Sequence, residues 1–208
     1  MMAAERLISA LKRRLVRAAG SAASFRADRK GSVAIEFGLV AIPFLALLFA
    51  IFQTALVIFT GQVLDTALQD ASRLILTGQA QNMTAANFAT GPNGVCSHIT
   101  ALFDCTGAYN AGTLQIDIRS PSSFANAVLS PPTVSGSSIN WGTGNGQPLY
   151  SNPGTSQIVI VRAAYLEPIY LSFPVTFMGA NMDSRLRTAG STTSRLVMST
   201  VAFRNEPF

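Results

Sequence analysis

Residues 30–52 read KGSVAIEFGLVAIPFLALLFAIF. The run opens on Lys30, carries one acid at Glu36, and then continues without Asp, Glu, Lys or Arg for the 28 residues from Phe37 to Leu64. A helix needs about 20 apolar residues to cross the hydrocarbon core of a bilayer, whereas a secretory signal has about 7 to 15. The stretch therefore predicts a membrane-spanning helix that stays in the membrane.

Composition and charge agree with a membrane-anchored protein. The chain has 208 residues, of which 49% are hydrophobic and 12% are charged, a low charge for a soluble domain. Residues 1–30 hold eight Lys and Arg with two acids, whereas residues 31–208 hold seven Arg with eight acids. The positive-inside bias then places the N-terminus in the cytoplasm and the body outside. Because the body has no basic patch, we expect no nucleic-acid partner.

The helix is predicted to continue beyond the membrane. Pro43 should kink the span without ending it, because lipid offers the backbone no other hydrogen-bond partner. Residues 61–76 have the apolar spacing of an amphipathic helix, and Gly78 is a suitable stop. The apolar positions are Leu64, Ala67, Leu68, Ala71, Leu74 and Ile75. We expect one helix from Val33 to Thr77, whose outer half needs an apolar surface to cover it.

Three later segments are predicted strands. In residues 113–119, Leu114, Ile116 and Ile118 alternate with Gln115, Asp117 and Arg119, which predicts a strand with one face in water. Residues 156–166 and 195–203 are rich in β-branched and aromatic side chains, so we expect them to join an antiparallel sheet on the outer helix. A long loop is expected at about 120–156, where charged residues are missing. The predicted fold class is α+β: a long N-terminal transmembrane helix continuing into a small extracytoplasmic antiparallel sheet domain.

Cys96 and Cys105 enclose eight residues. Outside the cytoplasm such a pair favours a disulfide, which is worth about 2 to 3 kcal/mol on the chain-entropy model. The alternative is a metal site with His98, but a fourth good ligand and the C-x-x-C spacing are missing. The chain has no second histidine, G-x-S-x-G motif or glycine-rich phosphate loop. We therefore expect no cofactor and no enzymatic activity; a membrane-anchored hydrolase is the competing class, with His98 as its only histidine.

The opening stretch also resembles a known processing site. Gly31, then SVAI, then Glu36-Phe37 and an apolar span, is similar to the N-terminal region of Tad-type (Flp) pilins and TadE-like pseudopilins. In that family a membrane-embedded prepilin peptidase cuts after the glycine, and the glutamate becomes the fifth residue of the new N-terminus. The resemblance implies cleavage between Gly31 and Ser32. It extends loosely to the C-terminal part, where residues 201–208, VAFRNEPF, resemble the Arg-Asn-Glu ending common in TadE-like proteins.

The resemblance implies an organisation and a role. Residues 1–31 would be a basic cytoplasmic leader, residues 32–78 the transmembrane and extended helix, and residues 79–208 a periplasmic α+β domain. Because major pilins of this system are much shorter than 208 residues, the chain would be a minor pseudopilin of the inner membrane, a structural, priming or tip component. Its partners would be the prepilin peptidase, membrane lipid, other pilin-like subunits and pilus assembly proteins. The alternative is an uncleaved, signal-anchored periplasmic binding or adhesive protein.

Two interpretations of Glu36 follow. In a bundle of pilin-like helices its carboxylate can pair with the new α-amino group of a neighbouring subunit, an attraction that is strong in low dielectric. Alternatively, Glu36 lies in the headgroup layer and is solvated, as charges at a membrane rim commonly are. The resemblance at Gly31 favours the first interpretation.

Overall fold

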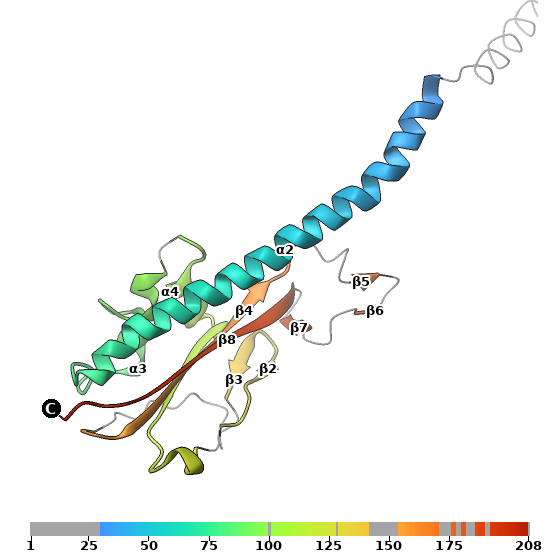
Figure 1. Ribbon diagram of the computed structural model, residues 1–208. Coiled ribbons are helices and arrows are strands. Elements are labelled where there is room, and N and C mark those ends of the chain that lie inside the picture. Colours follow the sequence, from blue (N-terminus) through green and yellow to red (C-terminus); the bar gives the residue numbers. More distant parts are fainter. Residues whose placement is uncertain are drawn as a thin grey trace, which may run out of the picture. The chain divides into compact units, whose positions relative to one another are not determined.

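The structure is a computed structural model (Figure 1). It describes residues 30–99, 101–127, 129–141, 154–170, 176–177, 180–181, 186–189 and 192–207. The chain divides into two compact units, Met1–Leu48 and Phe49–Phe208, and each is described by itself. Most of the predicted cytoplasmic leader lies outside the described residues.

One long helix, α2, runs from Lys30 to Leu76 and includes Pro43. It confirms the long apolar N-terminal helix that the sequence predicts. The chain leaves the helix at Gly78, whose φ is 76°, a left-handed conformation that glycine adopts without steric cost. The Gly78 N–H donates to the carbonyl of Ile75 at 3.1 Å, and the Ala80 N–H donates to the carbonyl of Leu74 at 3.0 Å. These bonds satisfy two carbonyls that the end of a helix leaves open.

The second unit contains an antiparallel sheet with the strand order β1-β4-β8-β7. The strands are β1 (Leu114–Arg119), β4 (Ile158–Pro168), β7 (Leu186–Ala189) and β8 (Thr192–Arg204). The three predicted strands correspond to β1, β4 and β8, so the predicted antiparallel sheet is confirmed. β4 pairs with β8 along its whole length, from Ile158 opposite Arg204 to Pro168 opposite Ser194.

Short elements fill the connections of the second unit. Between α2 and β1 lie α3 (Ala85–Thr90), the 3₁₀ turn η1 (Val95–His98) and α4 (Cys105–Asn110). Between β1 and β4 lie the 3₁₀ turn η2 (Phe124–Asn126), β2 (Thr133–Ser135) and β3 (Ser138–Asn140). The last pair is β5 (Thr176–Phe177) with β6 (Ala180–Asn181). The predicted long loop at about 120–156 thus includes a short antiparallel hairpin, β2–β3.

The main core lies where α2 meets one face of the sheet, with the segment from α3 to α4 closing it. Members from α2 include Leu64, Leu68 and Ile75, all at most 2% exposed. The sheet contributes Leu114, Ile116, Ile118, Val159, Val161 and Ala163. The α3–α4 segment contributes Phe88, Val95, Cys96 and Cys105. The apolar surface that the outer half of the helix was expected to need is therefore the sheet together with these short helices.

The opposite face of the sheet corrects one prediction. Gln115, Asp117 and Arg119 were expected to face water, but Asp117 is fully buried and the other two are half-buried. A second, smaller core covers this face, in which Trp141 and Ile139 at the end of the β2–β3 hairpin pack with Ala164 and Leu166 of β4. The prediction was wrong because a segment expected to be loop supplies a cover for the strand.

Candidate processing and assembly segment

The residues predicted for processing lie in the first two turns of α2. Gly31 and Ser32 are helical, and Glu36 and Phe37 are exposed, Phe37 by 74%. In a helix, residues four apart lie on the same face, so Ser32 and Glu36 are neighbours one turn apart. Helical geometry therefore places the backbone nitrogen that cleavage would free close to the acidic side chain.

The first unit of the chain presents an uncovered apolar surface. No residue of α2 between Val33 and Leu48 is buried. The large exposed side chains are Val33, Ile35, Phe37, Leu39, Val40, Ile42, Phe44, Leu45 and Leu47. Val33–Leu76 is the one helix in the described parts of the chain that is long and apolar enough to cross a membrane. A helix that is apolar all round suits hydrocarbon and does not suit water.

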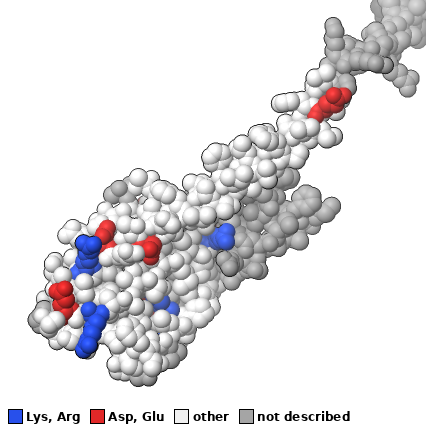
Figure 2. Space-filling view, viewed as in Figure 1, with Lys and Arg blue, Asp and Glu red and all other residues white. Residues whose placement is uncertain are grey.

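Within the second unit, the exposed side of α2 changes character. Its exposed large side chains are apolar up to Phe59: Ile51, Phe52, Leu56, Ile58 and Phe59. From Gln62 onward the exposed positions are polar: Gln62, Thr66, Gln69 and Arg73. On the face of the molecule shown in Figure 2, the charged side chains are few and most of them gather over the second unit. The change at residues 59–62 separates a surface suited to lipid from one suited to water.

Polar contacts hold α2 to the sheet on its covered side. The backbone N–H of Tyr170, just after β4, donates to Gln53 Oε1 at 3.3 Å. Ser199 Oγ of β8 donates to Asp65 Oδ1 at 2.7 Å. The N–H of Glu206 donates to the carbonyl of Leu76 at 3.2 Å. The three contacts therefore lie at Gln53, at Asp65 and at Leu76, the last residue of the helix.

A buried acid on β4 contacts α2 at Thr60. Glu167 of β4 is 7% exposed, and burial raises the pKa of its carboxyl group, while a hydrogen bond with the side chain of Thr60 acts in the opposite direction. Burial also raises the pKa of the Tyr165 hydroxyl, with the charge of Glu167 and Tyr170 adding to the effect. The ring of Tyr165 stacks on Phe103 at 4.0 Å between centroids.

No role was predicted from the sequence for Gln53 or Glu167. Gln53 is the first polar side chain after Glu36, which was a signal that could have drawn attention to it. Glu167 offered no comparable signal, because its burial depends on α2, which is more than 90 residues away in the sequence. Both residues act at the junction between helix and sheet.

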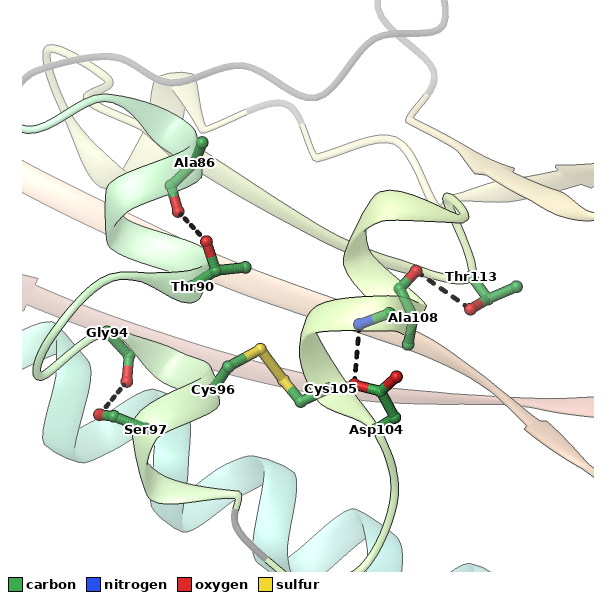
Figure 3. The surroundings of a disulfide bond; sticks show 10 residues. Ala86, Thr90, Gly94, Cys96, Ser97, Asp104, Cys105, Ala108 and Thr113 are labelled. Carbon is green, nitrogen blue, oxygen red and sulfur yellow. Dashed lines mark hydrogen bonds between the residues drawn. A yellow bond between two sulfur atoms is a disulfide. The ribbon is translucent and has the colours of Figure 1, made fainter.

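The two cysteines are joined in the structure (Figure 3). Cys96 in η1 and Cys105 at the start of α4 form a disulfide with a Cα–Cα distance of 5.4 Å, and both are buried in the main core. Asp104 caps α4, since its Oδ1 accepts from the N–H of Gly107 at 2.9 Å. His98 is exposed. Within the described ranges, no three His, Cys, Asp or Glu residues are grouped as metal ligands would be.

A buried ionic cluster lies on the other face of the sheet. Asp117 Oδ2 accepts from Arg162 Nε at 3.1 Å and from Arg119 Nε at 2.8 Å. The Arg162 guanidinium also donates to the carbonyl of Ser130 at 2.8 Å and lies 4.4 Å from the ring centre of Trp141. These contacts fix the hairpin segment to the sheet. Asp117 pairs with two arginines, and one of them, Arg162, also packs against the ring of Trp141. The arrangement is structural, because Asp117 is paired with both arginines and these contacts join β1, β4 and the hairpin segment.

The comparisons with known proteins bear on the helix. The model of the TadE-like protein family matches residues 31–73. No curated protein and no solved structure matches the chain. The family match begins at Gly31, the predicted cleavage residue, and ends at Arg73 in α2. It confirms the predicted TadE-like resemblance for this region and supports involvement in Tad pilus assembly.

Proposed function

We propose that this chain, with a TadE-like region at residues 31–73, is a minor pseudopilin that serves as a structural, priming or tip component in Tad (Flp) pilus biogenesis. The observation that carries the proposal is the start of the family match at Gly31, where an uncovered apolar helix begins. The role needs no catalytic group in this chain. Its partners are other pilin-like subunits, pilus assembly proteins and the prepilin peptidase.

The proposed topology follows from charge and hydrophobicity. Residues 1–31 form a basic leader in the cytoplasm, because positively charged segments stay on that side of the inner membrane. Residues 32–78 form the transmembrane and extended helix, and residues 79–208 form the periplasmic domain. A periplasmic location suits the Cys96–Cys105 disulfide, since that compartment is oxidising.

The proposed mechanism has a processing step and an assembly step. The peptidase hydrolyses the peptide bond between Gly31 and Ser32, which frees an α-amino group on Ser32. In the membrane, the Glu36 carboxylate of one subunit pairs with the α-amino group of the next. Because the dielectric constant is low there, an axial position of the subunit that leaves these two charges unpaired is energetically costly. Pro43 lies within α2 and is expected to kink the span without ending it. Phe37 belongs to the motif that the peptidase meets after the cleavage site.

The first step is tested by the intact mass of the protein isolated from its native host. Cleavage after Gly31 removes 31 of the 208 residues, and the mature chain begins with Ser32. Gly31→Leu should abolish the cut, because the peptidase then meets a bulky residue at the scissile bond. Gly38→Leu is the matched control, since nothing lies within 4 Å of a Cβ at Gly38. A mature chain that still begins near Met1 would favour the uncleaved, signal-anchored binding or adhesive protein.

A further inference from the structure

Along the axis of α2, the sheet begins to cover one side of the helix at a level where the exposed side of the helix is still apolar. From Val33 onward, the first buried residue of α2 is Gln53, whereas the last large apolar residue on its exposed side is Phe59. At 1.5 Å per residue, these two positions are about 9 Å apart along the axis. The tip of the sheet unit therefore begins about 9 Å before the lipid-like surface of the helix ends.

Tyr170 marks the tip of the sheet at this level. It follows β4 by two residues, and its N–H is bound to the side chain of Gln53. Its own side chain is 73% exposed, although it lies in the same unit as a well-formed core. An exposed tyrosine that is fixed by its backbone next to exposed apolar residues is typical of a membrane interface, where the ring meets lipid and the hydroxyl meets water.

The length of the span gives the same position for the interface. A hydrocarbon core takes about 20 helical residues, so a span that starts at Val33 ends near Phe52, one residue before Gln53. The headgroup layer on each side adds about 5 to 8 Å, which is close to the axial distance from Gln53 to Phe59. The overlap between the sheet tip and the apolar helix surface is thus comparable to the thickness of one headgroup layer, and slightly larger.

We propose that the tip of β4 at Tyr170, together with Phe52 and Phe59 of α2, lies in the lipid headgroup layer at the periplasmic face of the membrane. The inference rests on the proposed membrane insertion of α2. The occupant of this surface is lipid, because large apolar side chains remain exposed on α2 beyond the span, at Leu56, Ile58 and Phe59. The hydrogen bond from Tyr170 to Gln53 then holds the domain directly against the bilayer, with no free linker between span and sheet.

The test uses full-length protein in phospholipid vesicles and single added tryptophans. The native Trp141 is fully buried and provides the baseline emission of the parent protein. Tyr170→Trp places a reporter at the proposed interface. Phe124→Trp is the matched control, since Phe124 is 61% exposed but lies in η2, remote from the tip. Phe44→Trp, at a site that is 58% exposed within the predicted span, reports on insertion itself.

Bromine atoms on the phospholipid acyl chains quench tryptophans that lie at the same depth. With bromines near the headgroup end of the chains, the emission added by Tyr170→Trp should fall at least about twofold, and with bromines near the chain ends it should fall less. Phe124→Trp should not respond in either vesicle. If Phe44→Trp is quenched and Tyr170→Trp is not, the span inserts but the tip stands clear of lipid, and the inference is wrong. If Phe44→Trp is also unquenched, α2 does not insert, and the proposed function fails with it.

Discussion

The two halves of α2 are both rich in apolar residues, but they meet different surroundings. Between Val33 and Leu48 the apolar side chains point in every direction and none is buried. Between Thr60 and Leu76 they lie on one side, where Leu64 and Leu68 are fully buried against the sheet. An apolar surface all round needs partners outside the chain, whereas an amphipathic one can be satisfied within it. The first half should therefore serve assembly, and the second half should serve folding.

The largest difference is expected from two leucines of the same helix. Leu68→Ala removes a fully buried side chain and should lower the free energy of unfolding by about 3 kcal/mol. Leu47→Ala is the matched variant, since Leu47 is 63% exposed and should leave the value unchanged. Chemical denaturation of the full chain in detergent, followed by Trp141 emission, measures both. Equal losses from the two variants would show that the division into halves is wrong.

The α3–α4 segment, which helps to cover the second half of α2, contains the disulfide. Removing the disulfide should lower the free energy of unfolding by less than Leu68→Ala does. Replacing Cys96 and Cys105 together by Ser should lower the free energy of unfolding by about 2 to 3 kcal/mol, because the short loop gains freedom in the unfolded chain. The same denaturation assay measures the loss. Reductant should destabilise the native protein to a similar extent and leave the double variant unaffected. A native protein whose stability ignores reductant would contradict this.

The free energy of unfolding should also depend on pH, through Glu167, which contacts the second half of α2 at Thr60. Burial raises the pKa of Glu167 from its ordinary value of 4.5, so the folded state holds this proton more tightly than the unfolded state. The resulting stabilisation is complete below the unfolded pKa and is lost as pH rises through the folded pKa. The side chain of Thr60 forms a hydrogen bond with this carboxyl group, and Tyr165 interacts with it electrostatically. Arg195 lies opposite Glu167 in the register of β4 and β8.

The loss with rising pH should disappear in Glu167→Gln, which keeps the shape of the side chain and removes the titration. The free energy of unfolding is measured from pH 4 to 8, with Glu206→Gln as the control because Glu206 is exposed. A native profile and a Glu167→Gln profile that run parallel would contradict the prediction.

The smallest effect on stability is expected in the first half, at Glu36. Glu36→Gln keeps the size of the side chain and should leave the free energy of unfolding, membrane abundance and cleavage after Gly31 unchanged. It should lose co-purification with other pilin-like subunits, because the pairing with a neighbour's α-amino group is gone. Glu36→Asp keeps the charge and should retain part of the co-purification. Full partner recovery with Glu36→Gln would return Glu36 to a solvated charge at the membrane rim.

The parts of the fold that depend on local pattern could be predicted. The long helix follows from an apolar run and an amphipathic repeat, and β1 follows from alternation in residues 114–119. The stop at Gly78 follows from the conformational freedom of glycine. Each of these signals lies within one element, so no knowledge of the partner segment is needed.

The parts that depend on distant partners could not be predicted. Asp117 seemed to face water because its partner Arg162 is 45 residues away and its cover comes from a hairpin in a stretch without a clear strand pattern. Gln53 was visible as a polar residue, but Tyr170, which binds it, is 117 residues away. The processing residues are proposed from the family resemblance, because local chemistry alone left Glu36 with two interpretations.

The pairing of β4 with β8 has a mechanical consequence. Both strands run alongside the second half of α2 (Figure 1), and their ladder extends from Ile158 opposite Arg204 to Pro168 opposite Ser194. Hydrogen bonds between antiparallel strands lie perpendicular to the strands. A force that pulls the two strands in opposite directions along their length therefore loads the whole ladder in shear, so that many bonds share the tension and must break together. The β4–β8 pair therefore resists sliding of one strand along the other far better than it would resist being peeled apart one bond at a time.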